Sequence, residues 1–155
     1  MTIPPNLLEK ERILIDARLS TRSMVIEAIA GMFADSEISG EAIEEKLLER
    51  EELGSTGIGF GVAIPHARLK DLQSTRAAFV KTRDPVDFNA PDETSVDLIF
   101  ALLVPEGSNE DYLRLLANLA RFFSDADNRE LLRNAGSAEE VLDVLGRSEA
   151  RRQSA

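Results

Sequence analysis

The segment GSTGIGFGVAIPH, residues 54–66, contains the residue types best suited to chemistry. His66 at its end is the only histidine of the chain, and a neutral imidazole nitrogen is a competent nucleophile near neutral pH. Four glycines lie within positions 54–61, where positive φ angles and successive N–H groups could form a nest for an anion. A nucleophile beside such donors is typical of phosphoryl transfer.

Three side chains before His66 add donors that suit a phosphate group. Arg50 offers a planar guanidinium, and Ser55 and Thr56 offer hydroxyls. Each of these residues also has a structural interpretation, because Ser and Thr stabilise turns and a late-helix arginine complements the helix dipole. His66 could itself be a satisfied core histidine at the end of a strand. The residue types alone leave both interpretations open.

Other familiar site motifs are absent or poorly matched. No Gly-Lys-Ser/Thr follows the glycines as in a P-loop, and GIGFG has the wrong spacing for a dinucleotide fingerprint. One histidine and no cysteine leave only carboxylates as metal ligands, and none has HExxH spacing, so we expect no metal and no cofactor. A Ser-His-Asp triad stays open by composition, although no GxSxG segment is present.

Composition limits the class of protein and its partners. A chain of 155 residues with 43% apolar residues suits one globular domain. The formal charge of −10 argues against nucleic-acid binding, which needs clustered Lys and Arg. No apolar run approaches the roughly 20 residues of a membrane-spanning helix, and the N-terminus lacks the order of a signal peptide. We therefore expect a soluble cytoplasmic protein that does not insert into a membrane.

The elements around the glycine segment are expected to bring Arg50 and His66 together. A helix over 39–53, capped by Ser39 and ended by Gly54, places Arg50 near its end. GVAIPH is typical of a short strand that Pro65 stops or moves to a sheet edge.

The remaining elements indicate one sheet covered by helices. Strands are expected over 76–82 and 96–104; the second is apolar enough to be covered on both faces, and a loop over 83–94 could hold a short strand at 86–88. Helices are expected over 24–33, 110–123, 128–134 and 137–145, with the capping candidates Ser20 or Thr21, Ser108 or Asn109, Asp125, and Ser137 with Glu140. The pattern predicts an α/β (α+β) domain over 1–145 with a single mixed β-sheet flanked by helices, followed by a flexible tail over 146–155.

The stretch LLEREELGSTGIGFGVAIPHARL, residues 47–69, resembles the fructose/mannitol-type enzyme IIA domains of the bacterial phosphotransferase system. The arginine, the GSTGIG loop and the AIPH segment match in order and spacing, and VDLIFALLVPEG fits the next block of that family. The resemblance covers about residues 8–145. Within the family, the chain is most similar to the nitrogen-regulatory enzyme IIA proteins, which are stand-alone domains of about this length.

The resemblance implies the enzyme IIA fold, a phosphoryl acceptor and its helpers. The histidine in the place of His66 accepts a phosphoryl group through Nε2 from the phosphohistidine of an HPr-type phosphocarrier, as a phosphoryl carrier and not an ordinary turnover enzyme. Arg50, Ser55 and Thr56 are expected to stabilise that group, with Gly57 lining the site. Many relatives have a second histidine where this chain has Tyr112, which we expect to line the site as well.

Three functions follow from the resemblance. The first is a regulatory protein of nitrogen or general metabolism that changes partners when His66 is phosphorylated. The second is a sugar-uptake enzyme IIA that passes the phosphoryl group to an enzyme IIB, and the third is a non-phosphorylated binding module with the same fold. The sequence names neither the regulated target nor the oligomeric state.

Overall fold

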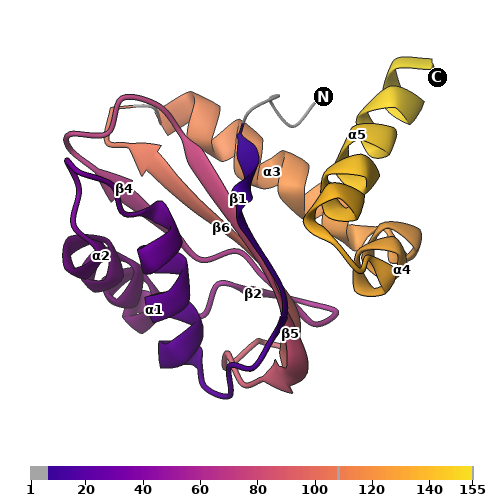
Figure 1. The fold of residues 1–155 in the computed structure, drawn as a ribbon, viewed down its shortest axis with the longest axis horizontal. Coiled ribbons are helices and arrows are strands. Elements are labelled where there is room, and N and C mark those ends of the chain that lie inside the picture. Colours follow the sequence, from indigo (N-terminus) through magenta and orange to yellow (C-terminus); the bar gives the residue numbers. More distant parts are fainter. Residues whose placement is uncertain (1–6, 108, 155) are drawn as a thin grey trace.

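The computed structural model describes the backbone of residues 7–107 and 109–154, and the side chains of residues 7–107 and 109–146. One mixed sheet lies between two layers of helices (Figure 1), which confirms the predicted α/β class and the single sheet. The strands are β1 (Leu8–Ala17), β2 (Gly57–Gly59), β3 (Val62–Ala63), β4 (His66–Leu69), β5 (Arg76–Val86) and β6 (Val96–Pro105). The helices are α1 (Arg22–Phe33), α2 (Gly40–Leu53), α3 (Asn109–Ser124), α4 (Ala126–Asn134) and α5 (Ala138–Ser154).

The position of His66 depends on how the sheet is paired around β6. The strand order is β1-β5-β6-β3-β2; β5 pairs antiparallel with β6, and both β3 and β4 pair parallel with it. Val62 pairs with Leu98 and His66 with Leu102, so β3 and β4 follow one another along the same edge of β6. Pro65, which has no N–H to donate, separates them. The strand predicted for GVAIPH is therefore broken, and His66 begins β4 instead of ending a strand.

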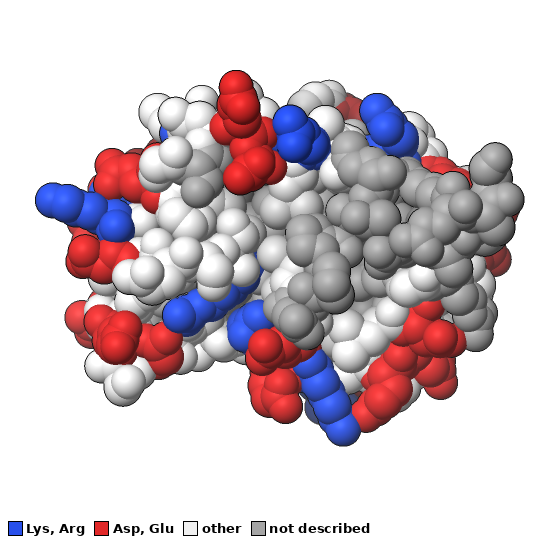
Figure 2. All heavy atoms as spheres, turned by 90° about the horizontal axis from the view of Figure 1, so that it is seen from above, with Lys and Arg blue, Asp and Glu red and all other residues white. Residues whose placement is uncertain are grey.

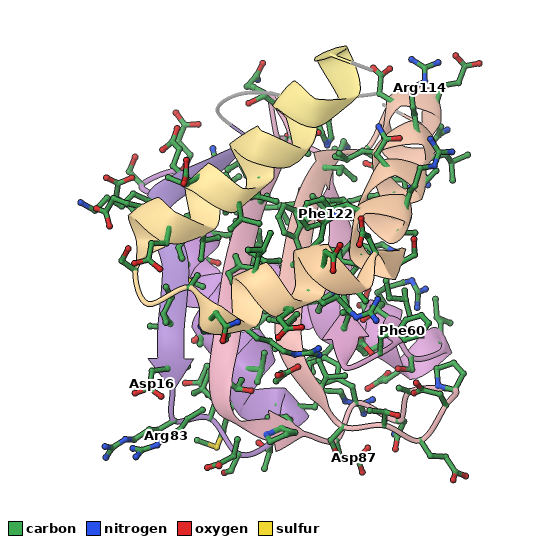
Figure 3. All side chains as sticks on the ribbon, turned by 90° about the vertical axis from the view of Figure 1, so that its right-hand side faces the viewer. Asp16, Phe60, Arg83, Asp87, Arg114 and Phe122 are labelled. Atoms are coloured by element: carbon green, nitrogen blue, oxygen red, sulfur yellow. The ribbon has the colours of Figure 1, made fainter. Side chains whose placement is uncertain are left out.

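The continuous apolar run of β6 fills two cores at once. Successive side chains of a strand point to opposite faces, so alternate residues of β6 contact opposite helical layers. The core under α3, α4 and α5 contains Leu98, Phe100 and Leu102, and the core under α1 and α2 contains Ile99, Ala101 and Leu103. Phe122 of α3 lies in the first core, between the helices and the sheet (Figure 3). The prediction of a central strand covered on both faces is confirmed.

Helix starts agree closely with the predicted capping residues. The residues whose side chains accept a hydrogen bond from the first turn of α1, α2, α4 and α5 are Thr21, Ser39, Asp125 and Ser137. Glu140 also takes part in the cap of α5, as predicted. Its Oε2 accepts from the N–H of Gly136 at 2.9 Å, one residue before the capping residue Ser137. For α3, Asn109 is the first helical residue and not the cap, and the other candidate, Ser108, lies outside the described residues.

The first strand is the longest element that the sequence patterns did not predict. β1 pairs parallel with β5 at the end of the sheet. Residues 9–12 are all charged, so they hide the alternation of apolar and polar residues that predicts a strand. That alternation becomes visible only where Ile13 and Ile15 pack against the core. β5 also continues past its predicted end at Thr82 to Val86. The predicted loop over 83–94 therefore begins later, and of the strand predicted at 86–88 only Val86 belongs to a strand.

The last helix bears on two expectations made from the sequence. α5 extends to Ser154, but its side chains are described only to Gly146. The division into a domain over 1–145 and a flexible tail over 146–155 therefore stays a prediction. Neither α5 nor any other helix in the described part of the chain is long and apolar enough to cross a membrane.

Gly61 offers a test of the turn that leads into the site. Phe60 and Gly61 connect β2 to β3 with φ angles of 60° and 79°, as a two-residue hairpin turn requires. A Cβ on Gly61 would lie 2.6 Å from Nη2 of Arg133, which is paired with Asp97. We predict that Gly61→Ala lowers the free energy of unfolding by about 1–3 kcal/mol in urea titrations.

The control for this prediction is a glycine with free space around it. A Cβ on Gly31, inside α1, would meet nothing within 4 Å. Gly31→Ala should therefore raise the free energy of unfolding by about 1 kcal/mol. Effects of equal size and sign in the two variants would contradict the role given to the turn.

Candidate functional site

Both ring nitrogens of His66 take part in hydrogen bonds that fix its tautomer. Nδ1 lies 2.8 Å from the carbonyl oxygen of Ile64, and Nε of Arg50 donates to Nε2 at 3.1 Å. A carbonyl can only accept and a guanidinium can only donate. His66 is therefore neutral, with the proton on Nδ1 and a lone pair on Nε2, which is the nitrogen able to act as a nucleophile.

Arg50 reaches His66 from the last turn of α2, where the sequence places it. Its Nη1 donates to the carbonyl oxygen of Gly54 at 2.7 Å, just past the end of that helix. A cation at a helix C-terminus is favourable because the last carbonyls carry partial negative charge. The guanidinium therefore has two tasks: it fastens the end of α2 and it orients Nε2 of His66.

A hollow of about 350 Å³ opens beside the histidine. β4 pairs with β6 on one side only, so side chains from both helical layers reach its other edge. Residues from α2, β4 and α3 form the lining, namely Lys46, Glu49, Arg50, Leu53, His66, Ala67, Arg68 and Tyr112. The hollow is the space in which another group could approach Nε2.

Tyr112 and Arg68 form another part of the wall of the hollow. The Tyr112 ring contacts the His66 ring edge to face, with centroids 5.5 Å apart and planes at 84°. Cζ of Arg68 lies 4.6 Å from the centroid of Tyr112, and its Nη1 donates to Oδ1 of Asn109 at 2.7 Å. Arg68 was not among the residues predicted for the site. The prediction that a strand ends at His66 hid the signal: His66 and Arg68 are two residues apart in β4, and residues two apart in a strand share a face.

Ser55, Thr56 and Gly57 are not among the residues that line the hollow. The hydroxyl of Ser55 donates to the carbonyl of Phe88 and accepts from the N–H of Gly57. Thr56 is 5% exposed, and its hydroxyl donates to the carboxylate of Glu51. These contacts agree with the turn-stabilising interpretation. The idea that both hydroxyls hold a phosphoryl group stays a prediction.

The surroundings change the pKa of two rings in the hollow. Burial lowers the pKa of His66, the hydrogen bond to Ile64 opposes that shift, and the charges of Arg50 and Arg68 add to it. Burial raises the pKa of Tyr112, against the effect of both arginines. At neutral pH the imidazole is thus a neutral base, and the phenol keeps its proton and can donate a hydrogen bond.

A titration of His66 tests this arrangement. We predict a midpoint below the ordinary value of 6.5, and nitrogen chemical shifts of the Nδ1-protonated tautomer, in ¹H–¹⁵N NMR spectra, where the single histidine gives one set of signals. The sign follows from the charge: a lowered pKa keeps the imidazole neutral as the pH falls through 6.5, and the nucleophile is lost only below the lowered pKa. A midpoint at or above 6.5, or the other tautomer, would contradict the geometry.

The charges of the hollow suit an anion better than a metal. Three cations, Lys46, Arg50 and Arg68, line it with one carboxylate, Glu49. Among the described side chains, those of residues 7–107 and 109–146, no group of three or more His, Cys, Asp or Glu could hold a metal ion. On the face drawn in Figure 2, Lys and Arg are interspersed with Asp and Glu instead of forming one basic patch. A small, compact anion is the ligand that this lining favours.

Comparison with known proteins gives consistent matches over nearly the whole chain. Residues 6–148 match the family described as phosphoenolpyruvate-dependent sugar phosphotransferase system, EIIA 2. The nitrogen regulatory protein of Pseudomonas aeruginosa is 41% identical over 141 residues, which cover 90% of this chain and 92% of that protein. The fructose-specific EIIA component of Haloferax volcanii is 40% identical over 105 residues, 68% of each chain. The crystal structure of nitrogen regulatory protein IIA-Ntr from Neisseria meningitidis has a TM-score of 0.87 at 41% identity, covering 90% of this chain and 96% of that one.

Proposed function

Since the chain belongs to the EIIA 2 family of the phosphoenolpyruvate-dependent sugar phosphotransferase system, we propose that His66 accepts a phosphoryl group from an HPr-type phosphocarrier and that the protein acts mainly as a nitrogen or metabolic regulator. The observation that carries the proposal is the neutral His66, which lines the hollow and whose Nε2 accepts a hydrogen bond from Nε of Arg50. Two relatives named as nitrogen regulatory proteins, each 41% identical, support the regulatory role. The cytoplasmic location expected from the sequence belongs to the same proposal.

The transfer step needs no proton to move between residues. The lone pair on Nε2 of His66 forms a bond to phosphorus while the phosphorus–nitrogen bond of the carrier breaks, and the electron pair of that bond returns to the carrier's imidazole. The proton on Nδ1 stays in its hydrogen bond to Ile64, which stabilises the positive charge that develops on the ring. Arg50, released from Nε2, can then donate to a phosphoryl oxygen.

The proposal is tested by rebuilding the relay from purified proteins. With phosphoenolpyruvate, enzyme I and an HPr-type carrier, intact-mass measurements should show one added phosphoryl group that is labile in acid. Peptide mapping should locate it on His66, and His66→Gln should remain unlabelled. An unlabelled wild-type protein, or a label on another residue, would overturn the assignment.

Sugar uptake is the second candidate function, and the fructose-specific relative from Haloferax volcanii at 40% identity favours it. In that role phosphorylated His66 would pass its group to an enzyme IIB. Rapid dephosphorylation by a cognate enzyme IIB would support uptake and count against a purely regulatory role. The binding module that is never phosphorylated ranks below both, and stoichiometric labelling of His66 would exclude it.

A further inference from the structure

Arg68 is an exposed arginine that two contacts from α3 hold in one place. Its Nη1 donates to Asn109 at 2.7 Å, and its guanidinium lies over the ring of Tyr112, at 4.6 Å. An arginine side chain that moves freely in water has a high conformational entropy. Contacts that hold it in one place must offset the entropy that it loses. The hydrogen bond and the cation–π contact do so, and they keep the guanidinium at the wall of the hollow that contains His66.

Arg50 by itself leaves part of a phosphoryl group without partners. Its Nε and Nη1 donate to Nε2 of His66 and to Gly54. When Nε2 bonds to phosphorus, Nε is released while Nη1 stays with Gly54, so Nε and Nη2 can present one edge of the guanidinium. The group that arrives carries its charge over three oxygens, and a guanidinium edge pairs with two at most. Arg68 comes from β4 and is held by α3, whereas Arg50 comes from α2, so the two can approach the group from different sides.

We propose that Arg68 is the second phosphoryl-binding residue of this site, where it pairs with oxygens of the group on Nε2 of His66 that Arg50 does not reach. Tyr112 and Asn109 act as its positioning residues. The part of this proposal that concerns a phosphoryl group bonded to His66 rests on the proposed function. The affinity of the two guanidinium groups for free phosphate does not depend on that function. The lowered pKa of His66, to which Arg68 contributes, is consistent with a cation close to the nucleophile.

The first experiment compares Arg68→Gln with a matched arginine variant. Arg83 is exposed and lies near one end of the sheet, away from Arg114 (Figure 3). Arg114 follows Tyr112 by two residues in α3, so it marks the side of the molecule where the hollow lies. Arg83→Gln changes the net charge equally and should label like the wild type. Arg68→Gln should label about 10–100-fold more slowly, the effect of losing one hydrogen bond to a charged group. Arg68→Lys keeps the charge but loses the guanidinium, and Asn109→Ala keeps the guanidinium but removes one of the contacts that hold it, so both variants should fall between.

The second experiment uses inorganic phosphate and the NMR signals of His66. Phosphate should shift these signals in the wild type and in Arg83→Gln. In Arg68→Gln the affinity for phosphate should be lower by at least about tenfold. The titration midpoint of His66 should also rise in Arg68→Gln. Slower labelling with unchanged phosphate affinity and midpoint would overturn the proposal, because it would assign Arg68 to docking of the carrier.

The two experiments separate this proposal from the proposed function. If the wild type is not labelled but phosphate binding depends on Arg68, the anion site stands and the phosphoryl-acceptor function fails. If the wild type is labelled and Arg68→Gln matches Arg83→Gln in rate, phosphate affinity and midpoint, the function stands and the role of Arg68 is wrong.

Discussion

Phosphoryl transfer to His66 should slow by about 100- to 1,000-fold in Arg50→Gln, which is the usual cost of removing a preorganised hydrogen-bond donor from a reacting centre. Two losses combine in this variant. The hydrogen bond from Nε, which orients Nε2 at 3.1 Å, disappears, and so does a cation that lines the hollow. Arg50→Lys should recover only part of the rate, because an ammonium group keeps the charge but cannot donate to both Nε2 and Gly54 with the same geometry.

The measurement is the single-turnover rate of labelling by phosphorylated carrier. Loss of Arg50 also removes one charge that lowers the pKa of His66, so the variant should hold more protonated, unreactive imidazole near neutral pH. Working at about pH 8, where both imidazoles are neutral, isolates the loss of the donor from this effect. Arg83→Gln again serves as the control for net charge. A rate for Arg50→Gln equal to that of Arg83→Gln would remove Arg50 from the mechanism.

The parts of the fold that could be predicted from sequence are those fixed by local chemistry. Thr21, Ser39, Asp125 and Ser137 each accept a hydrogen bond from an N–H two or three residues later, so local sequence indicates where α1, α2, α4 and α5 begin. The apolar run of β6 is long enough that only a strand between two helical layers could bury it. β1 escaped prediction because its partner, β5, lies far along the chain, and its charged first half has no local signature of a strand.

Without the family resemblance, which also pointed to Tyr112, the site was predictable only where sequence neighbours are also neighbours in space. Arg50 and His66 stand on either side of one glycine loop, and their contact follows from the helix, the loop and the strand in succession. The hydroxyls of Ser55 and Thr56 lie in the same loop, but the first donates to Phe88, which comes from a distant segment. The contacts that hold Arg68 at the wall of the hollow come from Asn109 and Tyr112 of α3, which are also distant in sequence. Which way a loop side chain turns depends on such distant partners, and no local pattern contains that information.

Glu51→Ala should lower the free energy of unfolding by about 3 kcal/mol, because it leaves buried donors without acceptors. Glu51 is 4% exposed and its carboxylate accepts from both the N–H and the hydroxyl of Thr56, with Nη1 of Arg22 at 3.9 Å. The adjacent Glu52 is exposed, so Glu52→Ala removes the same charge from the same helix and should change stability by no more than about 0.5 kcal/mol. Urea titrations of the three proteins provide the comparison.

Glu51→Ala should also disturb the site, because Gly54 lies in the short segment whose ends, Glu51 and Thr56, are joined by these hydrogen bonds. Arg50 is fixed by the carbonyl of Gly54, so a looser segment should let its guanidinium move away from Nε2 of His66. Under conditions where Glu51→Ala is still folded, the NMR midpoint of His66 should shift and labelling should slow, whereas Glu52→Ala should match the wild type in both. Thr56→Val, which keeps the N–H bond to Glu51 and loses the hydroxyl, should give a smaller change in each quantity. Loss of stability without any change at His66 would mean that Glu51 supports the fold alone and that the segment does not transmit its position to Arg50.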